Sequence, residues 1–310
     1  MQDRVKPPIG RHDLEPKRKL WDIIAICYVI VYFSFLMYKL GYYTLSWDEG
    51  ARAHATSILF LNAHTIFTDP VRYFTYYVNQ YPFYPPLYSM MATLFSILLG
   101  LSTFAIRLPG AIFGALTLFA TYKFGKLLYN DRVGFISTVL LSSYPFFYVS
   151  SHGAGLDIPI TFFVVMALYF LYKALVEARQ SSYLYAGLML GLGLLTKYPI
   201  ILLVLSMTII LLLLMKKIHL GNRRGLTIIT MDLEILKGLI IMTLVSIACV
   251  APWAYETLIV KNQLKEWLDA SQIQTAPFTL QTIIGYYIPF SLPQLLSLIH
   301  ISEPTRQAEI

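Results

Sequence analysis

The chain has 310 residues, of which 57% are hydrophobic and only 13% are charged, and its formal net charge is +7. Soluble domains contain about 45–50% apolar and about 25% charged residues, so the composition excludes an ordinary soluble fold and predicts a polytopic membrane protein. The positive charge does not indicate nucleic-acid binding, because Lys and Arg form short clusters between apolar runs, as in cytoplasmic membrane loops. Cys27 and Cys249 both lie inside apolar runs, so no disulfide framework is predicted.

The apolar runs predict the membrane-spanning helices. A spanning helix needs roughly 17–25 mostly apolar residues. The N-terminal arm, residues 1–20, is basic and is followed by no cleavage site, so we expect a cytoplasmic arm and not a signal peptide. The sequence predicts an all-α, polytopic transmembrane helical bundle. Seven complete spans are predicted, and a truncated eighth begins near Thr282: 22–40, 108–128, 133–151, 157–175, 182–197, 199–215 and 236–255.

One more apolar stretch, 83–106, decides the predicted topology. If it crosses the membrane, the most basic loop of the chain, 216–224, faces the outside. If it does not cross, every basic cluster faces the cytoplasm, as the positive-inside rule requires. We therefore expect 83–106 to be a re-entrant or interfacial helix on the outer face, and Pro85 and Pro86 suit its first turn. The alternative is that 83–106 crosses and the charge rule fails.

This topology places the polar residues that could do chemistry at the outer face. Four segments are expected there: 41–107, 152–156, the turn at 197–199, and 256–281. The first is by far the longest and is rich in aromatic residues. It includes an amphipathic stretch at 49–62, which is typical of a helix that lies on the membrane surface.

Two adjacent carboxylates, Asp48 and Glu49, follow the first predicted helix. A carboxylate at this place can act as a general base, and its neighbour can orient an acceptor or hold a divalent cation. The alternative is an ordinary helix N-terminus, because acids favour the positive end of a helix dipole.

Three more charged residues are expected at the same face. Arg107 follows more than thirty uncharged residues, and its planar guanidinium suits phosphate oxygens, although it can also be an interfacial anchor. Asp157 lies near His152 and two glycines, where an aspartate is often only a helix cap. Lys197 lies at the turn of a helical hairpin, where the positive-inside rule disfavours a cation, so it is a candidate for binding a lipid phosphate.

Motifs of other enzyme classes are missing from the sequence. It has no Walker-type glycine-rich loop, no HExxH motif or cysteine pair at metal spacing, and no GxSxG elbow. These absences argue against nucleotide hydrolysis, zinc proteolysis and α/β-hydrolase chemistry.

Taken in order, the short motifs resemble the GT-C superfamily of membrane glycosyltransferases. The branch they resemble contains the dolichyl-phosphate-mannose-protein mannosyltransferases and the related lipid A aminoarabinose transferase. The resemblance covers roughly residues 20–260 and rests on the order and spacing of these pieces: Asp48-Glu49, Tyr84-Pro85-Pro86-Leu87-Tyr88, Arg107-Leu108-Pro109, Gly110 with Gly114, Gly155-Leu156-Asp157, Gly193-Leu194-Leu195-Thr196-Lys197 and Pro252-Trp253.

The resemblance implies a function as well as a GT-C fold. It implies an enzyme that moves a hexose or pentose from a polyprenyl-phosphate carrier to a protein, lipid or glycan acceptor on the outer face, with inversion. Asp48 would be the catalytic base, and a divalent cation held by Asp48 and Glu49 stays an open alternative. The site residues that the resemblance implies are the acids Asp48, Glu49 and Asp157, the phosphate contacts Arg107 and Lys197, and the further substrate contacts Tyr84 and His152.

Two positions depart from the family pattern. Tyr84 stands where the best-known members have His or Lys, and Phe83 stands where the aminoarabinose transferase has Glu. These departures weaken an assignment to that enzyme and to any metal site at position 84. The rival interpretation is a transporter or flippase, which predicts charges near mid-bilayer and inverted repeats, and no such repeat is found in the sequence. A structural membrane subunit would predict nothing about Asp48 or Lys197.

We expect an integral protein of a prokaryotic plasma membrane, surrounded by membrane lipids, with its N-terminus in the cytoplasm and its active site outside. Three parts are predicted: the arm 1–20, a GT-C catalytic module at 21–295 that lacks its C-terminal part, and 296–310. Residues 296–306 resemble the in-frame translation of a transposase sequencing-library adapter, so 296–310 are set apart from the fold as a tag would be.

Overall fold

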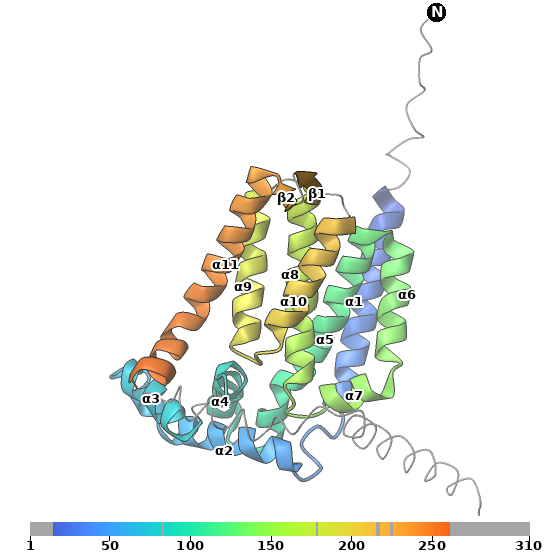
Figure 1. The fold of residues 1–310 in the computed structure, drawn as a ribbon. Coiled ribbons are helices and arrows are strands. Elements are labelled where there is room, and N and C mark those ends of the chain that lie inside the picture. The colour runs from blue at the N-terminus through green and yellow to red at the C-terminus, as the bar shows by residue number, and fades with distance from the viewer. Residues whose placement is uncertain (1–14, 82–83, 178, 215–217, 224–225, 261–310) are drawn as a thin grey trace, which may run out of the picture. The chain divides into compact units, whose positions relative to one another are not determined.

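The structure is a computed structural model that describes residues 15–81, 84–177, 179–214, 218–223 and 226–260 (Figure 1). The predicted α-helical bundle is confirmed, and a short antiparallel β-hairpin is present in addition. The predicted eighth span and the segment 296–310 lie outside the described residues. The helices and strands are α1 (Glu15–Met37), α2 (Trp47–Leu61), α3 (Pro70–Gln80), α4 (Leu87–Leu99), α5 (Thr103–Leu128), α6 (Asp131–Ser142), α7 (Pro145–Ser151), α8 (Asp157–Glu177), α9 (Gln180–Leu194), α10 (Ile200–Leu214), β1 (Ile218–Arg223), β2 (Leu226–Met231) and α11 (Leu233–Ala254).

Two groups of helices are visible in Figure 1. The apolar helices α1, α5, α6, α8, α9, α10 and α11 run side by side, while α2, α3, α4 and α7 gather at one end of them. The start of α1 and the β1–β2 hairpin lie at the opposite end. An ion pair fixes part of that end, because Lys126 near the end of α5 lies 2.7 Å from Asp22 and 2.6 Å from Asp131. The start of α1 and the β1–β2 hairpin, which adjoin the predicted basic arm and belong to the predicted basic loop, share this end of the described bundle.

Several helix boundaries differ from the predicted ones for local reasons. Helix α5 begins at Thr103 and not at 108, because the Ser102 side chain caps it by accepting a hydrogen bond from the Ala105 N–H. The predicted span 133–151 is two helices, α6 and α7, bent by 75°. Pro145 explains the break, since proline disfavours the helical conformation of the residue before it.

The predicted count of seven complete spans stays a prediction. By length and composition, four described helices can cross a membrane, namely α1, α5, α8 and α11, and the bent pair α6–α7 can supply a fifth span. Helices α9 and α10 have 15 residues each, which makes them about 22 Å long, whereas the hydrocarbon core is about 30 Å thick.

The described part of the stretch 83–106 begins at residue 84 and contains α4 and the first turn of α5, with Gly100 between them at φ 84°. Helix α4 has 13 residues and is about 20 Å long, too short to cross the hydrocarbon core alone. It lies with α2 at one end of the bundle (Figure 1), and Tyr88 in α4 donates a hydrogen bond to the carbonyl of Ile106 in α5 at 3.0 Å. Its length and position agree with the expected re-entrant or interfacial helix.

Candidate functional site

The most extensive polar network in the described part of the chain surrounds Arg107, which is only 4% exposed. An arginine has five N–H donors, and all five are used here. Nε and one terminal nitrogen donate to Glu49 at 2.7 and 2.9 Å. The remaining three N–H groups donate to backbone carbonyls of the segment that joins α1 to α2, those of Leu40, Tyr43 and Thr44, at 3.0–3.1 Å.

The carboxylate of Glu49 is equally saturated. Besides the two bonds from Arg107, it accepts hydrogen bonds from the backbone N–H groups of Ser46 and Ala154, both at 2.8 Å. A carboxylate has about four acceptor positions, so none is left. Burial alone would raise the pKa of Glu49, but these four hydrogen bonds and the Arg107 charge lower the pKa to about 2.

These contacts correct two roles expected from the sequence. Arg107 lies inside α5 and has no donor left for a substrate phosphate. Glu49 has no lone pair left for a proton or a metal ion. In this geometry the two residues form a buried clamp that joins α2, α5, the 40–44 segment and the 152–156 loop. The clamp thereby fixes the backbone position of Asp48, the residue before Glu49.

A glycine makes the loop contact of this clamp possible. A Cβ added at Gly110 in α5 would lie 2.2 Å from the carbonyl oxygen of Gly153, and real side chains do not tolerate such a distance. The absence of a side chain at 110 lets the 152–156 loop approach α5 closely, and this approach brings the Ala154 N–H within reach of Glu49.

Asp48, the predicted base, differs from Glu49 in its exposure and in its contacts. It lies in the first turn of α2 and is exposed. Within the described ranges, no hydrogen bond or ion pair engages its carboxylate. The structure thus separates the two adjacent acids into a buried structural one and a solvent-facing one that is free to accept a proton.

The predicted residues Asp157 and Lys197 meet each other. The Lys197 ammonium lies 2.7 Å from an oxygen of Asp157, and the two side chains are 43% and 59% exposed. Asp157 begins α8, and Lys197 lies in the turn between α9 and α10. An ion pair this exposed is weak, so an incoming phosphate can compete with Asp157 for Lys197.

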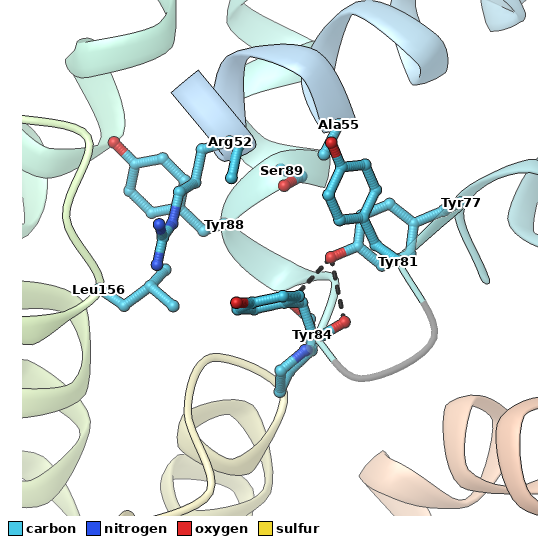
Figure 2. Close-up of a pocket in the computed structure, with 10 residues that line it drawn as sticks. Arg52, Ala55, Tyr77, Tyr81, Tyr84, Tyr88, Ser89 and Leu156 are labelled. Carbon is cyan, nitrogen blue, oxygen red and sulfur yellow. Dashed lines mark hydrogen bonds between the residues drawn. The ribbon is translucent and has the colours of Figure 1, made fainter. Parts of the chain in front are cut away.

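A pocket lies beside these residues (Figure 2). About 290 Å³ of space, open solvent included, lies between its lining residues. Four of its ten lining residues are tyrosines, and Arg52 is the charged residue in its lining. The lining residues are Ala51, Arg52, Ala55, Tyr77, Tyr81, Tyr84, Pro85, Tyr88, Ser89 and Leu156.

Backbone connections place this pocket next to the ion pair. Leu156 in the pocket wall is the residue before Asp157. The N–H of Leu87, at the start of α4, donates to the carbonyl of Leu195 at 2.9 Å, which joins the pocket segment 84–86 to the turn that carries Lys197. The clamp joins the same 152–156 loop to α2. The pocket, the Asp157–Lys197 ion pair and the clamp are therefore joined through adjacent backbone segments.

Among the other predicted contacts, Tyr84 lines the pocket but His152 does not. The His152 ring nitrogen Nε2 lies 3.0 Å from the carbonyl oxygen of Tyr38, and the ring stacks on Tyr148, so His152 supports the loop. Sequence reasoning missed Arg52, one helical turn after Asp48. The amphipathic pattern of 49–62 could have indicated Arg52, because a helix there places Arg52 on the same face as Asp48, four residues earlier.

The donor set does not fit the metal site expected at Asp48 and Glu49. All acceptor positions of Glu49 are occupied by hydrogen bonds. In the part of the chain that the structure describes, no three His, Cys, Asp or Glu side chains come together as metal ligands. No step of the chemistry below is therefore derived through a metal ion.

Known proteins resemble this chain both in sequence and in fold. The family model described as dolichyl-phosphate-mannose-protein mannosyltransferase matches residues 84–245. The crystal structure of ArnT from Cupriavidus metallidurans in the apo state is 20% identical, with a TM-score of 0.59 over 79% of this chain and 43% of that chain. The structure of the same protein bound to undecaprenyl phosphate is 17% identical, with a TM-score of 0.63 over 89% of this chain and 50% of that chain. A search of curated proteins finds no match.

The chain thus spans half or less of the length of the two solved structures, and at these identities the likeness concerns the fold. The region matched by the family model carries the pocket segment at Tyr84, the clamp residue Arg107 and both members of the Asp157–Lys197 pair. Because that region is more than half of the chain, this integral membrane protein belongs to the dolichyl-phosphate-mannose-protein mannosyltransferase family, and its fold is of the GT-C type seen in ArnT.

Proposed function

We propose that the protein transfers a sugar from a polyprenyl-phosphate donor to an acceptor hydroxyl on the outer face of the membrane, with inversion of the anomeric centre. The observation that carries the proposal is the separation of the two acids: Glu49 is held in a buried clamp, while the exposed Asp48 lies one helical turn before Arg52, which lines the pocket. Family membership and the undecaprenyl phosphate bound to the ArnT structure support the donor class.

In the proposed reaction Asp48 accepts the proton of the acceptor hydroxyl. The hydroxyl oxygen attacks the anomeric carbon from the side opposite the phosphate and forms the new C–O bond. The bond between the anomeric carbon and the phosphate oxygen breaks, and its electron pair leaves with the polyprenyl phosphate. Attack from the opposite side inverts the anomeric carbon, and the atoms and charges balance without another reactant.

Two cations are proposed to stabilise the departing phosphate. Arg52 uses one N–H for the carbonyl of Asp48, and no other hydrogen bond of its guanidinium is found among the described residues, so four donors stay available. Among the described residues, the exposed Asp157 is the ion-pair partner of Lys197. A fixed cation that faces developing negative charge lowers the barrier, and Arg52 therefore takes the phosphate role that the sequence assigned to Arg107.

The test is a comparison of three variants in detergent or nanodiscs. One assay measures the transfer of labelled mannose from a polyprenyl-phosphate donor to a total membrane acceptor fraction. A second assay measures the binding of undecaprenyl phosphate. Asp48→Asn keeps the shape of the side chain but cannot accept the proton, so we expect loss of turnover by at least about 100-fold with unchanged binding. Lys197→Ala is expected to weaken binding of the phosphate.

Asp232→Asn is the matched control, because Asp232 caps α11 with an oxygen that asparagine keeps. It should change neither quantity. Near wild-type turnover of Asp48→Asn would refute the base assignment and make Asp157 the next candidate. If neither Asp48→Asn nor Lys197→Ala has an effect, the transferase proposal fails and the transporter interpretation takes its place.

A further inference from the structure

Arg52 is held over the face of an aromatic ring that comes from a different segment of the chain. Its guanidinium carbon lies 5.9 Å from the centre of the Tyr84 ring, within the range of a cation–π contact. Figure 2 shows Arg52 extending from α2 toward Leu156 and the Tyr84 ring across the pocket. Without such a contact, the long arginine side chain would sample many rotamers, and ordering it would reduce the affinity for an anion.

Contacts that do not involve Arg52 fix the backbone at Tyr84, and a neighbouring ring packs against the Tyr84 ring, which is 50% exposed. The Tyr77 hydroxyl donates to the carbonyls of Tyr84 and Pro85 at 3.0 and 3.2 Å. Tyr77 is 2% exposed, and burial raises its pKa, so it stays a donor. The Tyr81 ring meets the Tyr84 ring edge-on, with centres 6.3 Å apart. Tyr84 is therefore a preformed platform.

Helix α2 is also joined to Tyr81, the residue whose ring packs against Tyr84. His54, two residues after Arg52, forms a hydrogen bond between Nδ1 and the Tyr81 hydroxyl. Arg52 also donates to the carbonyl of Asp48, one turn earlier in α2. These contacts fix the helix and one terminal nitrogen of the Arg52 guanidinium, and the Tyr84 ring faces the same guanidinium.

We propose that Tyr84 is a positioning residue whose ring directs the Arg52 guanidinium toward the phosphate of the polyprenyl carrier. This inference rests on the proposed role of Arg52 as a phosphate contact. It differs from the direct substrate contact that the sequence suggested for Tyr84, because the ring acts through its electron-rich face on Arg52.

The test varies the charge on the ring face while keeping the ring shape. Position 84 is replaced by phenylalanine and by phenylalanines with one, two and three fluorine atoms, and the Kd for undecaprenyl phosphate is measured in detergent. Tyr84→Phe should bind within about twofold of wild type, since the face is retained, and Tyr84→Leu should bind about two- to fivefold more weakly. The logarithm of Kd should rise steadily with each fluorine, which a packing role would not cause.

The chain offers a matched control pair. Arg72 lies 5.8 Å from the ring centre of Tyr76, and its Nε donates to the Tyr76 hydroxyl at 3.0 Å. This pair lies on α3 and does not line the pocket. Tyr76→Leu should therefore leave the Kd unchanged. Arg52→Gln should raise the Kd at least about tenfold, and in that background the fluorine series should become flat.

The outcomes separate the inference from the function on which it rests. If the fluorine series is flat while Arg52→Gln weakens binding, Tyr84 does not position Arg52, although the phosphate role of Arg52 stands. If Arg52→Gln leaves the Kd unchanged, both the phosphate role and the inference are refuted. A Tyr84→Leu protein that does not fold leaves the decision to the fluorinated series, because those variants keep the shape of the ring.

Discussion

The buried clamp allows a quantitative prediction for Glu49→Gln. Glutamine keeps one acceptor oxygen but replaces the other by an NH2 group, which would face N–H donors of Arg107 or of the backbone. The Arg107 guanidinium, whose side chain is 5% exposed, would stay buried without its counter-charge. Removing one partner of a buried ion pair costs about 3–5 kcal/mol, which lowers the ratio of folded to unfolded protein by a factor of roughly 10²–10⁴.

The assay is thermal unfolding in detergent, followed by intrinsic fluorescence. For a chain of this size, 1 kcal/mol corresponds to roughly 2–4 °C in Tm, so Glu49→Gln should lower Tm by about 6–20 °C. Asp48→Asn is the control one residue away. Its side chain is exposed and has no partner among the described residues, so its effect on stability should stay within about 0.5 kcal/mol. Equal Tm shifts for the two variants would refute the division between a structural and a solvent-facing acid.

The pH dependence of Tm tests the same clamp. The pKa of Glu49 is about 2 in the folded protein and 4.5 in its ordinary state, so the folded state binds the proton less tightly than the unfolded state does. The stabilisation from ionised Glu49 is therefore complete above about pH 5 and is lost as the pH falls through 4.5 toward 2. The Tm difference between wild type and Glu49→Gln should shrink over that range, and a constant difference would contradict the low pKa.

Two further predictions concern the loop and the topology. Gly110→Ala places a methyl group against the Gly153 carbonyl and should destabilise the protein by about 1–3 kcal/mol. Gly155→Ala is the control and should not destabilise the protein, because no atom lies within 4 Å of the added Cβ. Similar Tm values for the two variants would contradict the close approach of the loop to α5. In a cysteine-free background, a cysteine in place of Leu220 should react with a membrane-impermeant reagent only from the cytoplasmic side. A cysteine in place of Phe67, which is 93% exposed, should react from the outside. Labelling of position 220 from the outside would overturn the topology.

The sequence by itself determined the class of the protein, because class depends on composition and on the length of apolar runs. A chain with 57% hydrophobic and 13% charged residues can hide its apolar surface only in a membrane. Local signals also predicted α2, α8, α9, α10 and α11 to within three residues at each end, but they did not predict α3. They missed the bend between α6 and α7, since the effect of Pro145 depends on whether neighbouring helices hold the chain straight, and they missed the β1–β2 hairpin.

Only the tertiary structure decided which charged residues are free to act. Asp48 and Glu49 are adjacent in the sequence, but successive side chains of a helix point about 100° apart, so one can face the interior and the other the solvent. Which of them is buried depends on Arg107, which lies 58 residues away in the chain. The Glu49 carboxylate and three backbone carbonyls together use all five donors of Arg107 and leave Arg52 as the arginine available at the pocket. The sequence contains both acids and both arginines, but it does not contain their pairing, because the pairing is made by long-range contacts that exist only in the folded chain.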